Sequence, residues 1–196
     1  MNILFSILQY IQNNPVEIIG AILSLIYLYL SVKQKVSLWI FGFLSSAFYI
    51  VVFFQSKFYA DMSLNFYYLA VSIFGWISWK TGKQKTGSEL PVKRTKLLEA
   101  SVLTAATLVI YLIYYYILVN FTDSPLPRAD SFTTAVSIVA TWMLARKRIE
   151  HWLLWIVVDT VSAGLYFYKM LYPTAILFII YTIMAIVGFI QWRKSL

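Results

Sequence analysis

An aspartate lies inside a long apolar run, and this combination restricts the folds open to the chain. The run is Trp152–Lys169, with the sequence WLLWIVVDTVSAGLYFYK, and a helix of that length crosses most of a bilayer. Asp159 follows Trp152 by seven residues, which places it about 10 Å into a hydrocarbon layer roughly 30 Å thick. An ionisable group at that depth costs on the order of 3 kcal/mol, so we expect it to serve a function.

The composition indicates an all-α integral membrane protein. Apolar residues make up 61% of the 196 residues and charged residues 12%, and several apolar runs approach the twenty residues of a membrane-spanning helix. The runs do not alternate as the strands of a membrane barrel do. The chain has no cysteine and one histidine, His151, which argues against disulfides, thiol nucleophiles and metal clusters.

Seven transmembrane helices are predicted within a single membrane domain of residues 1–196. We expect a first three-helix repeat at 13–80, a linker helix at 97–121 and a second three-helix repeat at 129–194. Met1–Gln12 is a poor signal peptide, and we expect an interfacial turn or a lead-in to the first helix there. The predicted helices are about Pro15–Val32, Val36–Gln55, Asp61–Trp79, Leu97–Phe121, Ser131–Ala145 (beginning there or a few residues earlier), Trp152–Lys169 and Tyr172–Lys194.

The net charge of +8 follows from membrane topology in this interpretation. With the N-terminus outside, thirteen lysines and arginines fall in cytoplasmic segments and three fall outside, as the positive-inside rule requires. We therefore expect a multi-pass protein of the bacterial inner membrane with a periplasmic N-terminus and a cytoplasmic C-terminus. The basic charge then gives no reason to expect nucleic acid as a partner.

A shift of 113 residues superposes the two halves of the sequence without a gap. Tryptophans, glycines and basic residues then coincide: Trp39 with Trp152, Gly75 with Gly188, and Trp79-Lys80 with Trp192-Arg193. Each repeat has three helices, so a second copy that followed directly would be inverted in the membrane. The fourth helix lies between the copies and gives both the same orientation, so the repeats would be parallel. Transporters built in this way bind substrate near mid-membrane between the halves. A receptor or scaffold could also have arisen by such a duplication.

One face of the sixth predicted helix carries the candidate binding residues. Spacings of three and four align Trp152, Trp155, Asp159, Ser162 and Tyr166. No lysine or arginine is expected at the depth of Asp159, so the carboxyl group is protonated, hydrated in a cavity or available to a cation. Aromatic faces attract cations and stack on flat rings. The alternative is a structural aspartate that binds hydroxyl groups of neighbouring helices.

The second and third predicted helices add uncharged candidates. On the second they are Trp39, Ser46 and Tyr49, and on the third Asn65 and Tyr68; Asn65 could equally join two helices by a hydrogen bond. We expect Trp76, Trp79 and Trp192 to belong to an interfacial belt, and Gly75 and Gly188 to allow close helix packing.

Several of these segments resemble the PnuC family of bacterial vitamin transporters, over essentially the whole chain. The resemblance rests on the patterns at Tyr59–Tyr68, Gly75–Trp79, Asp130–Trp152 and Trp152–Asp159. The tryptophan motif of the family falls on Trp152 and Trp155, and its Asn-x2-Tyr pattern falls on Asn65 and Tyr68.

The resemblance implies a SWEET-like fold of two parallel three-helix bundles joined by a linker helix. It also implies a homotrimer that takes up an unphosphorylated vitamin by facilitated diffusion, with a cytoplasmic vitamin kinase trapping the product. The best-known cargo of the family is nicotinamide riboside, and the PnuT branch carries thiamine. Because members that carry nicotinamide riboside can have Asn where this chain has Asp159, we expect thiamine, with nicotinamide riboside as the alternative.

Other classes of function make different predictions. A receptor or scaffold predicts a structural Asp159, and proton-coupled transport predicts that a pH gradient drives accumulation. An enzyme is not expected, because no second catalytic acid, base or metal ligand accompanies Asp159. No cofactor and no metal are expected either.

Overall fold

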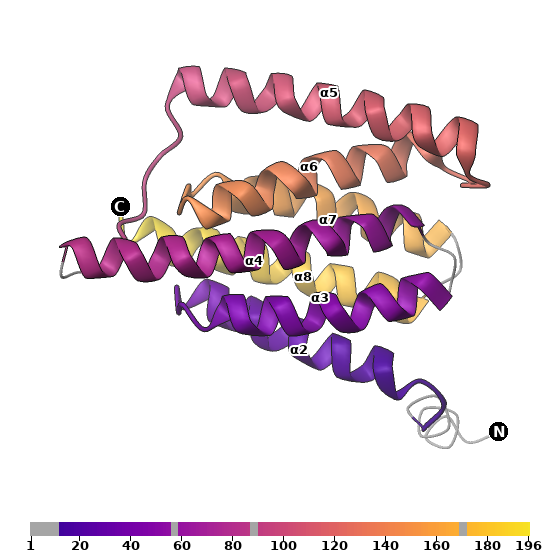
Figure 1. Ribbon diagram of the computed structural model, residues 1–196, viewed down its shortest axis with the longest axis horizontal. Helices are drawn as coiled ribbons and strands as arrows, with labels where there is room; N and C mark the ends of the chain where they lie inside the picture. The colour runs from indigo at the N-terminus through magenta and orange to yellow at the C-terminus, as the bar shows by residue number, and fades with distance from the viewer. Residues whose placement is uncertain (1–11, 56–58, 87–89, 169–171) are drawn as a thin grey trace.

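The computed structural model describes residues 12–55, 59–86, 90–168 and 172–196. These residues form seven long helices that run roughly along one axis (Figure 1). The first and the last described residues lie at opposite ends of this bundle. The helices are α2 (Pro15–Val32), α3 (Leu38–Gln55), α4 (Tyr59–Thr86), α5 (Leu97–Phe121), α6 (Pro127–Ala145), α7 (His151–Tyr168) and α8 (Tyr172–Arg193).

The all-helical class is confirmed, and one predicted helix bound is wrong by more than a few residues. Helix α4 continues past Trp79 to Thr86, because lysine, glutamine and threonine can extend a helix beyond an apolar segment. Helix α6 begins at Pro127, a few residues before Ser131 as the prediction allowed, since proline is favoured in the first turn. The prediction for Met1–Gln12 falls almost entirely outside the described residues.

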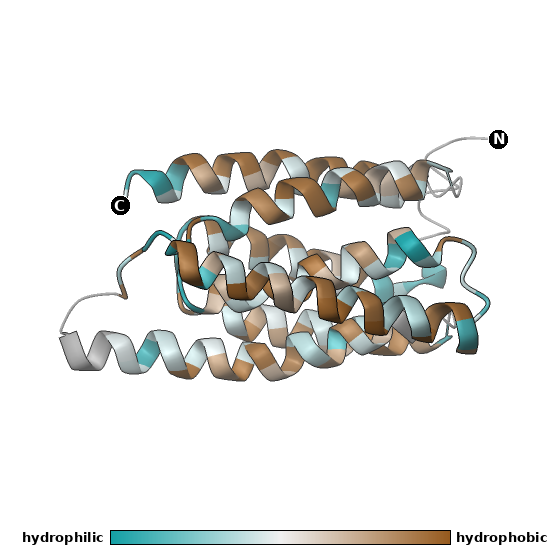
Figure 2. Cartoon of the chain, turned by 90° about the horizontal axis from the view of Figure 1, so that it is seen from above, coloured by the Kyte–Doolittle hydropathy of each residue, from teal (hydrophilic) through white to brown (hydrophobic). Residues whose placement is uncertain are grey.

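Four of the described helices are long and apolar enough to cross a membrane: α2, α3, α5 and α8. Helices α4, α6 and α7 are more polar, and most of α6 is buried inside the bundle. A helix shielded from lipid by its neighbours needs no apolar surface of its own. Figure 2 shows apolar residues along the length of the bundle and hydrophilic residues gathered toward its ends.

Neighbouring helices pack in the same order in the two halves. In the first half α3 lies between α2 and α4, and in the second α7 lies between α6 and α8. The halves meet where α2 packs against α8 and α4 against α6. Helix α5 lies at the edge of the bundle against α6 (Figure 1), and among its residues Leu118 is buried.

The turns after α2 and α6 have the same geometry at an offset of 113 residues. Gln34 and Lys147 both adopt positive φ angles, of 54° and 51°. Each turn closes through an equivalent backbone bond, from Lys35 N to Leu30 O and from Arg148 N to Met143 O. The two turns also meet, because Lys147 Nζ donates to Gln34 Oε1 at 3.2 Å across those 113 residues.

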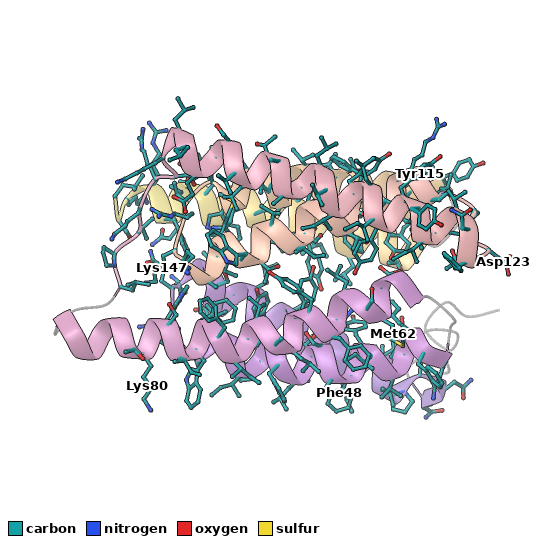
Figure 3. All side chains as sticks on the ribbon, turned by 45° about the horizontal axis from the view of Figure 1, so that its top comes forward. Phe48, Met62, Lys80, Tyr115, Asp123 and Lys147 are labelled. Atoms are coloured by element: carbon teal, nitrogen blue, oxygen red, sulfur yellow. The ribbon has the colours of Figure 1, made fainter. Side chains whose placement is uncertain are left out.

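Basic residues gather at the end of the bundle where these turns lie. Figure 3 shows Lys80 and Lys147 toward this end and Asp123 at the other. The segment before α5 is fastened here, since Lys93 N donates to Lys147 O at 3.0 Å and Ile149 N donates to Lys93 O at 3.1 Å. An ion pair between Arg148 Nη2 and Glu99 Oε2, at 2.9 Å, joins the start of α5 to the same turn.

Candidate functional site

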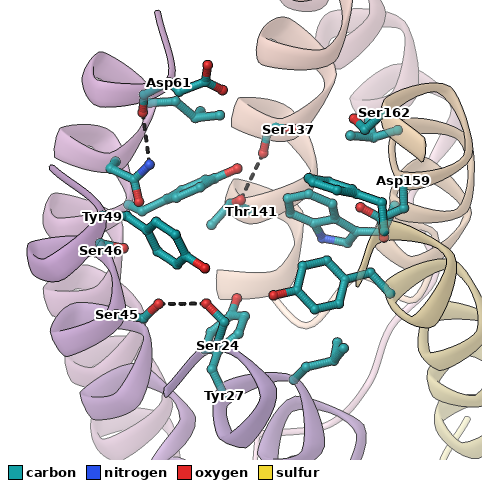
Figure 4. A pocket seen from close by; sticks show the side chains of 18 of the residues that line it. Ser24, Tyr27, Ser45, Ser46, Tyr49, Asp61, Ser137, Thr141, Asp159 and Ser162 are labelled. Atoms are coloured by element: carbon teal, nitrogen blue, oxygen red, sulfur yellow. Dashed lines mark hydrogen bonds between the residues drawn. The ribbon is translucent and has the colours of Figure 1, made fainter. Parts of the chain in front are cut away.

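A cavity of about 660 Å³ lies between the two halves of the bundle. Every described helix except α5 contributes to its lining. The volume lies within the range of small-molecule sites in proteins. Figure 4 shows polar and aromatic side chains converging on this space from several helices.

The structure places all ten predicted site residues around this one cavity. They are Trp39, Ser46, Tyr49, Asn65, Tyr68, Trp152, Trp155, Asp159, Ser162 and Tyr166. They come from the packed pair α3 and α4 in the first half and from α7 in the second half. Their part in binding a cargo stays a prediction.

Among the described residues, no lysine or arginine lines the cavity beside Asp159. Its side chain is 5% exposed, and no hydrogen bond or ion pair joins it to another described residue. Tyr68 and Tyr181 lie near enough to interact with its charge. A carboxylate so placed loses hydration without gaining a partner, so it favours a cation or a proton beside it.

Hydroxyl and amide groups line the side of the cavity formed by the first half. Ser24 and Ser45 share a hydrogen bond of 2.7 Å between their Oγ atoms, and Ser45 Oγ donates to Gly20 O at 3.2 Å. Asn65 Nδ2 donates to Asp61 O at 2.8 Å, and its amide oxygen is an acceptor that can serve a ligand. Asp159 of α7 thus lies across the cavity from these neutral polar groups (Figure 4).

Aromatic rings complete the lining. Tyr166 stacks on Phe178 with ring centroids 5.1 Å apart and an interplanar angle of 22°, and Tyr49 stacks on Phe53 at 5.5 Å. Trp155 lies one helical turn before Asp159 on α7 and is half-buried in the lining. Flat aromatic surfaces beside a carboxylate suit a planar cationic ring.

Four tryptophans close the end of the cavity nearest the basic turns. Trp39 packs edge-to-face on Trp79 at 5.6 Å, and Trp152 on Trp192 at 5.8 Å. Two of these indoles bond across the halves, from Trp79 Nε1 to Ala145 O at 3.1 Å and from Trp192 Nε1 to Ser31 O at 3.0 Å.

The predicted interfacial belt is therefore wrong for two of its three tryptophans. Trp79 and Trp192 are buried, whereas Trp76 is 41% exposed. Trp79 and Trp192 face the opposite half of the bundle, where each finds a carbonyl group that its indole nitrogen can reach.

Three buried polar atoms near this end have no hydrogen-bond partner among the described residues: Trp39 Nε1, Trp152 Nε1 and His151 Nε2. His151 Nδ1 lies 2.6 Å from Arg148 O, and a carbonyl accepts, so the proton is assigned to Nδ1 and Nε2 is an acceptor. Buried polar atoms without partners are costly, and these three belong to residues that line the cavity.

Sequence reasoning missed the contribution of α6. Asp130, Thr134, Ser137 and Thr141 line the cavity, and their spacing of three and four is a polar stripe that could have revealed them. It also missed Glu17 and Asp61, which line the cavity from the first turns of α2 and α4. Both lie close to the ends of predicted helices, where the sequence gives no reason to expect a carboxylate inside a cavity.

The bundle contains helices that are apolar enough to cross a membrane, and it encloses a polar, aromatic cavity. This combination is typical of a membrane transporter. The family model described as "Nicotinamide mononucleotide transporter" matches residues 14–194. The chain belongs to this family, and it is a multi-pass membrane transporter rather than an enzyme. The resemblance found in its motifs is confirmed.

Relatives with named cargoes align along most of the chain. The nicotinamide riboside transporter PnuC of Escherichia coli K12 is 26% identical over 204 residues, which cover 92% of this chain and 85% of that protein. PnuC of Neisseria mucosa is 28% identical over 173 residues, covering 83% and 65%. The riboflavin/roseoflavin transporter RibM of Streptomyces davaonensis is 25% identical, covering 90% and 83%.

A solved structure has the same fold. The crystal structure of the vitamin B3 transporter PnuC superposes with a TM-score of 0.80 and 24% identity, covering 97% of this chain and 85% of that one. At this identity the match shows the arrangement of the helices alone. The cargo has to be inferred from the residues that line the cavity.

Proposed function

We propose that this protein takes up a flat, cationic, unphosphorylated vitamin, and that the vitamin is nicotinamide riboside. The observation that carries the proposal is Asp159, a buried carboxylate in an aromatic cavity that has no partner among the residues the structure describes. A pyridinium ring supplies the missing positive charge and a planar face for Trp155. The ribose hydroxyls then have partners in the serines and Asn65 of the first half.

Thiamine was the expected cargo from sequence, and the relatives do not support that preference. Two of the relatives described above are named as nicotinamide riboside transporters and one as a riboflavin transporter. Both thiamine and nicotinamide riboside are cations, so Asp159 suits either. The hydroxyl-rich side of the cavity favours the cargo that carries a sugar.

We propose a SWEET-like arrangement, with repeats at 13–80 and 129–194 joined by the linker helix at 97–121. The equal turns at Gln34 and Lys147 support it. All seven helices would span the inner membrane, with the N-terminus periplasmic and the basic turns cytoplasmic. Rocking of the two halves would carry the vitamin by facilitated diffusion. A homotrimer and a cytoplasmic vitamin kinase that traps the product belong to the same proposal.

Titration calorimetry on the purified protein tests the cargo. Nicotinamide riboside, thiamine and riboflavin are compared side by side, and we expect nicotinamide riboside to bind most tightly. Uptake into proteoliposomes then tests the mode of transport, and we expect internal and external free vitamin to become equal. Accumulation driven by a pH gradient would contradict facilitated diffusion, and the absence of binding by all three vitamins would contradict the function.

A further inference from the structure

The side chain of Gln34 joins the two halves of the bundle at the end that carries the basic turns. Its Oε1 accepts a hydrogen bond from Lys147 Nζ at 3.2 Å, and its Nε2 donates to Ser195 Oγ at 3.1 Å. Lys147 follows α6 and Ser195 follows α8, so both partners belong to the second half. One residue of the first half therefore holds two separate segments of the second.

Lys147 is buried although it carries a charge. Its side chain is 2% exposed, and Nζ lies 4.5 Å from the centroid of the Trp79 ring. A buried ammonium group is costly unless polar or aromatic groups surround it. The Gln34 oxygen and the face of Trp79 offset part of that cost, so the position of this lysine depends on contact with the first half.

These contacts lie beyond the cavity, in layers that follow one another toward the end of the bundle. Trp39 and Trp152 line the cavity itself. Trp79 packs on Trp39 and Trp192 packs on Trp152, and Lys147 lies over Trp79. A vitamin that left the cavity at this end would have to pass between the halves through each of these layers.

Two hydrogen bonds in the tryptophan layer also cross between the halves. Trp79 Nε1 donates to Ala145 O at 3.1 Å, at the end of α6. Trp192 Nε1 donates to Ser31 O at 3.0 Å, near the end of α2. Each half thus binds the last turn of the opposite half, and separation of the halves at this end would break both bonds together with those of Gln34.

The closed arrangement also carries a cost that opening would relieve. The three buried polar atoms without a partner among the described residues, on Trp39, Trp152 and His151, lie at this same end. Water could reach such atoms only if the halves moved apart, and hydration would then offset part of the loss of the bonds between them. A junction that gains and loses bonds in this way can adopt both a closed and an open state.

We propose that Gln34 and Lys147 form the gate through which the vitamin leaves the cavity, a role that rests on the transport function proposed above. In the closed state described here their hydrogen bond holds the two halves together beyond the tryptophan layers. Rocking of the halves separates the pair and opens the cavity on the side of the basic turns. A link that keeps the pair together should therefore stop transport and leave binding intact.

Paired cysteines test the gate, because the chain has no cysteine of its own. Gln34→Cys/Lys147→Cys is cross-linked, before reconstitution into liposomes, by a bismaleimide whose spacer contains a disulfide that a reductant cleaves. Gln34→Cys/Ser195→Cys crosses the same junction and keeps the lysine. The control Glu99→Cys/Arg148→Cys replaces an ion pair of 2.9 Å at the same end, but it joins α5 to the second half, against which α5 already packs.

Uptake of radiolabelled nicotinamide riboside is measured before and after reduction, and its binding is measured by titration calorimetry. We expect both cross-linked gate pairs to lose at least about tenfold in uptake rate, to recover on reduction and to bind the vitamin throughout. The cross-linked control should transport at the rate of its reduced form. Undiminished uptake by the cross-linked gate pairs would overturn the proposal, as would an equal loss in the control or failure of the reagent to join either gate pair. A wild type that does not transport the vitamin would instead overturn the proposed function.

Discussion

The indole ring of Trp152 lies directly on Gly188. A Cβ atom built on Gly188 would stand 2.5 Å from Cζ2 of Trp152, and one built on Gly75 would stand 2.4 Å from Cε2 of Trp39. These two pairs hold α7 against α8 and α3 against α4. Because a real Cβ does not approach ring carbons so closely, each tryptophan keeps its place beside the cavity only while its partner is glycine.

Replacing Gly188 or Gly75 with alanine should displace the tryptophan that it supports. Overpacking of this kind costs about 1–3 kcal/mol, so we expect a lower unfolding temperature and weaker vitamin binding. Gly164→Ala is the matched control, because a Cβ there meets nothing within 4 Å and alanine favours a helix. Thermal unfolding in detergent tests the set, and equal stability of Gly188→Ala and Gly164→Ala would contradict the packing argument.

Trp79→Phe and Trp192→Phe should each destabilise the junction between the halves. Phenylalanine keeps an aromatic ring but cannot donate to Ala145 O or Ser31 O. Each variant loses one buried hydrogen bond, worth about 0.5–1.5 kcal/mol, although Ser31 O keeps Gln34 N as a donor. Trp76→Phe is the control, since Trp76 is 41% exposed. Unfolding temperatures of the three variants are compared, and a loss for Trp76→Phe as large as for the other two would refute the assignment.

Asp159→Asn should weaken binding of a cationic vitamin without weakening the fold. The amide keeps the size of the side chain but loses its charge, and we expect a loss of about tenfold in affinity, or about 1.4 kcal/mol. The unfolding temperature should stay the same or rise, because an unpaired buried carboxylate is a cost to folding. Calorimetry and thermal unfolding on one preparation test both effects; unchanged affinity would remove Asp159 from the site.

Trp155→Ala should remove a stacking surface for the ring of the vitamin. Stacking of a heterocycle on an aromatic side chain is worth about 1–3 kcal/mol by alanine substitution, so we expect affinity to fall by roughly tenfold or more. Trp155→Phe should restore part of it. Titration calorimetry on both variants tests the role, and equal losses for alanine and phenylalanine would indicate that the indole supports the helix packing instead.

Much of the fold could be predicted because it depends on features that a sequence displays directly. Long apolar runs set the bounds of α2 and α5, and a repeated pattern of tryptophan, glycine and basic residues marks the two halves. Asp159 could be singled out because a carboxylate in such a run is costly. The residues that line the cavity beside it follow from helical spacing alone.

The other features of the fold and the site depend on which side of each helix faces lipid and which side faces another helix. The hydropathy of a segment does not report that orientation. Trp79 near a predicted membrane border looks the same whether it faces lipid or the opposite half of the bundle. Thr141 satisfies its own hydroxyl through Ser137 O at 2.8 Å, so the only sign of its position in the sequence is the polar stripe that it shares with Thr134 and Ser137. Glu17 lines the cavity because α2 packs against α8, and the sequence does not show that these two helices are neighbours.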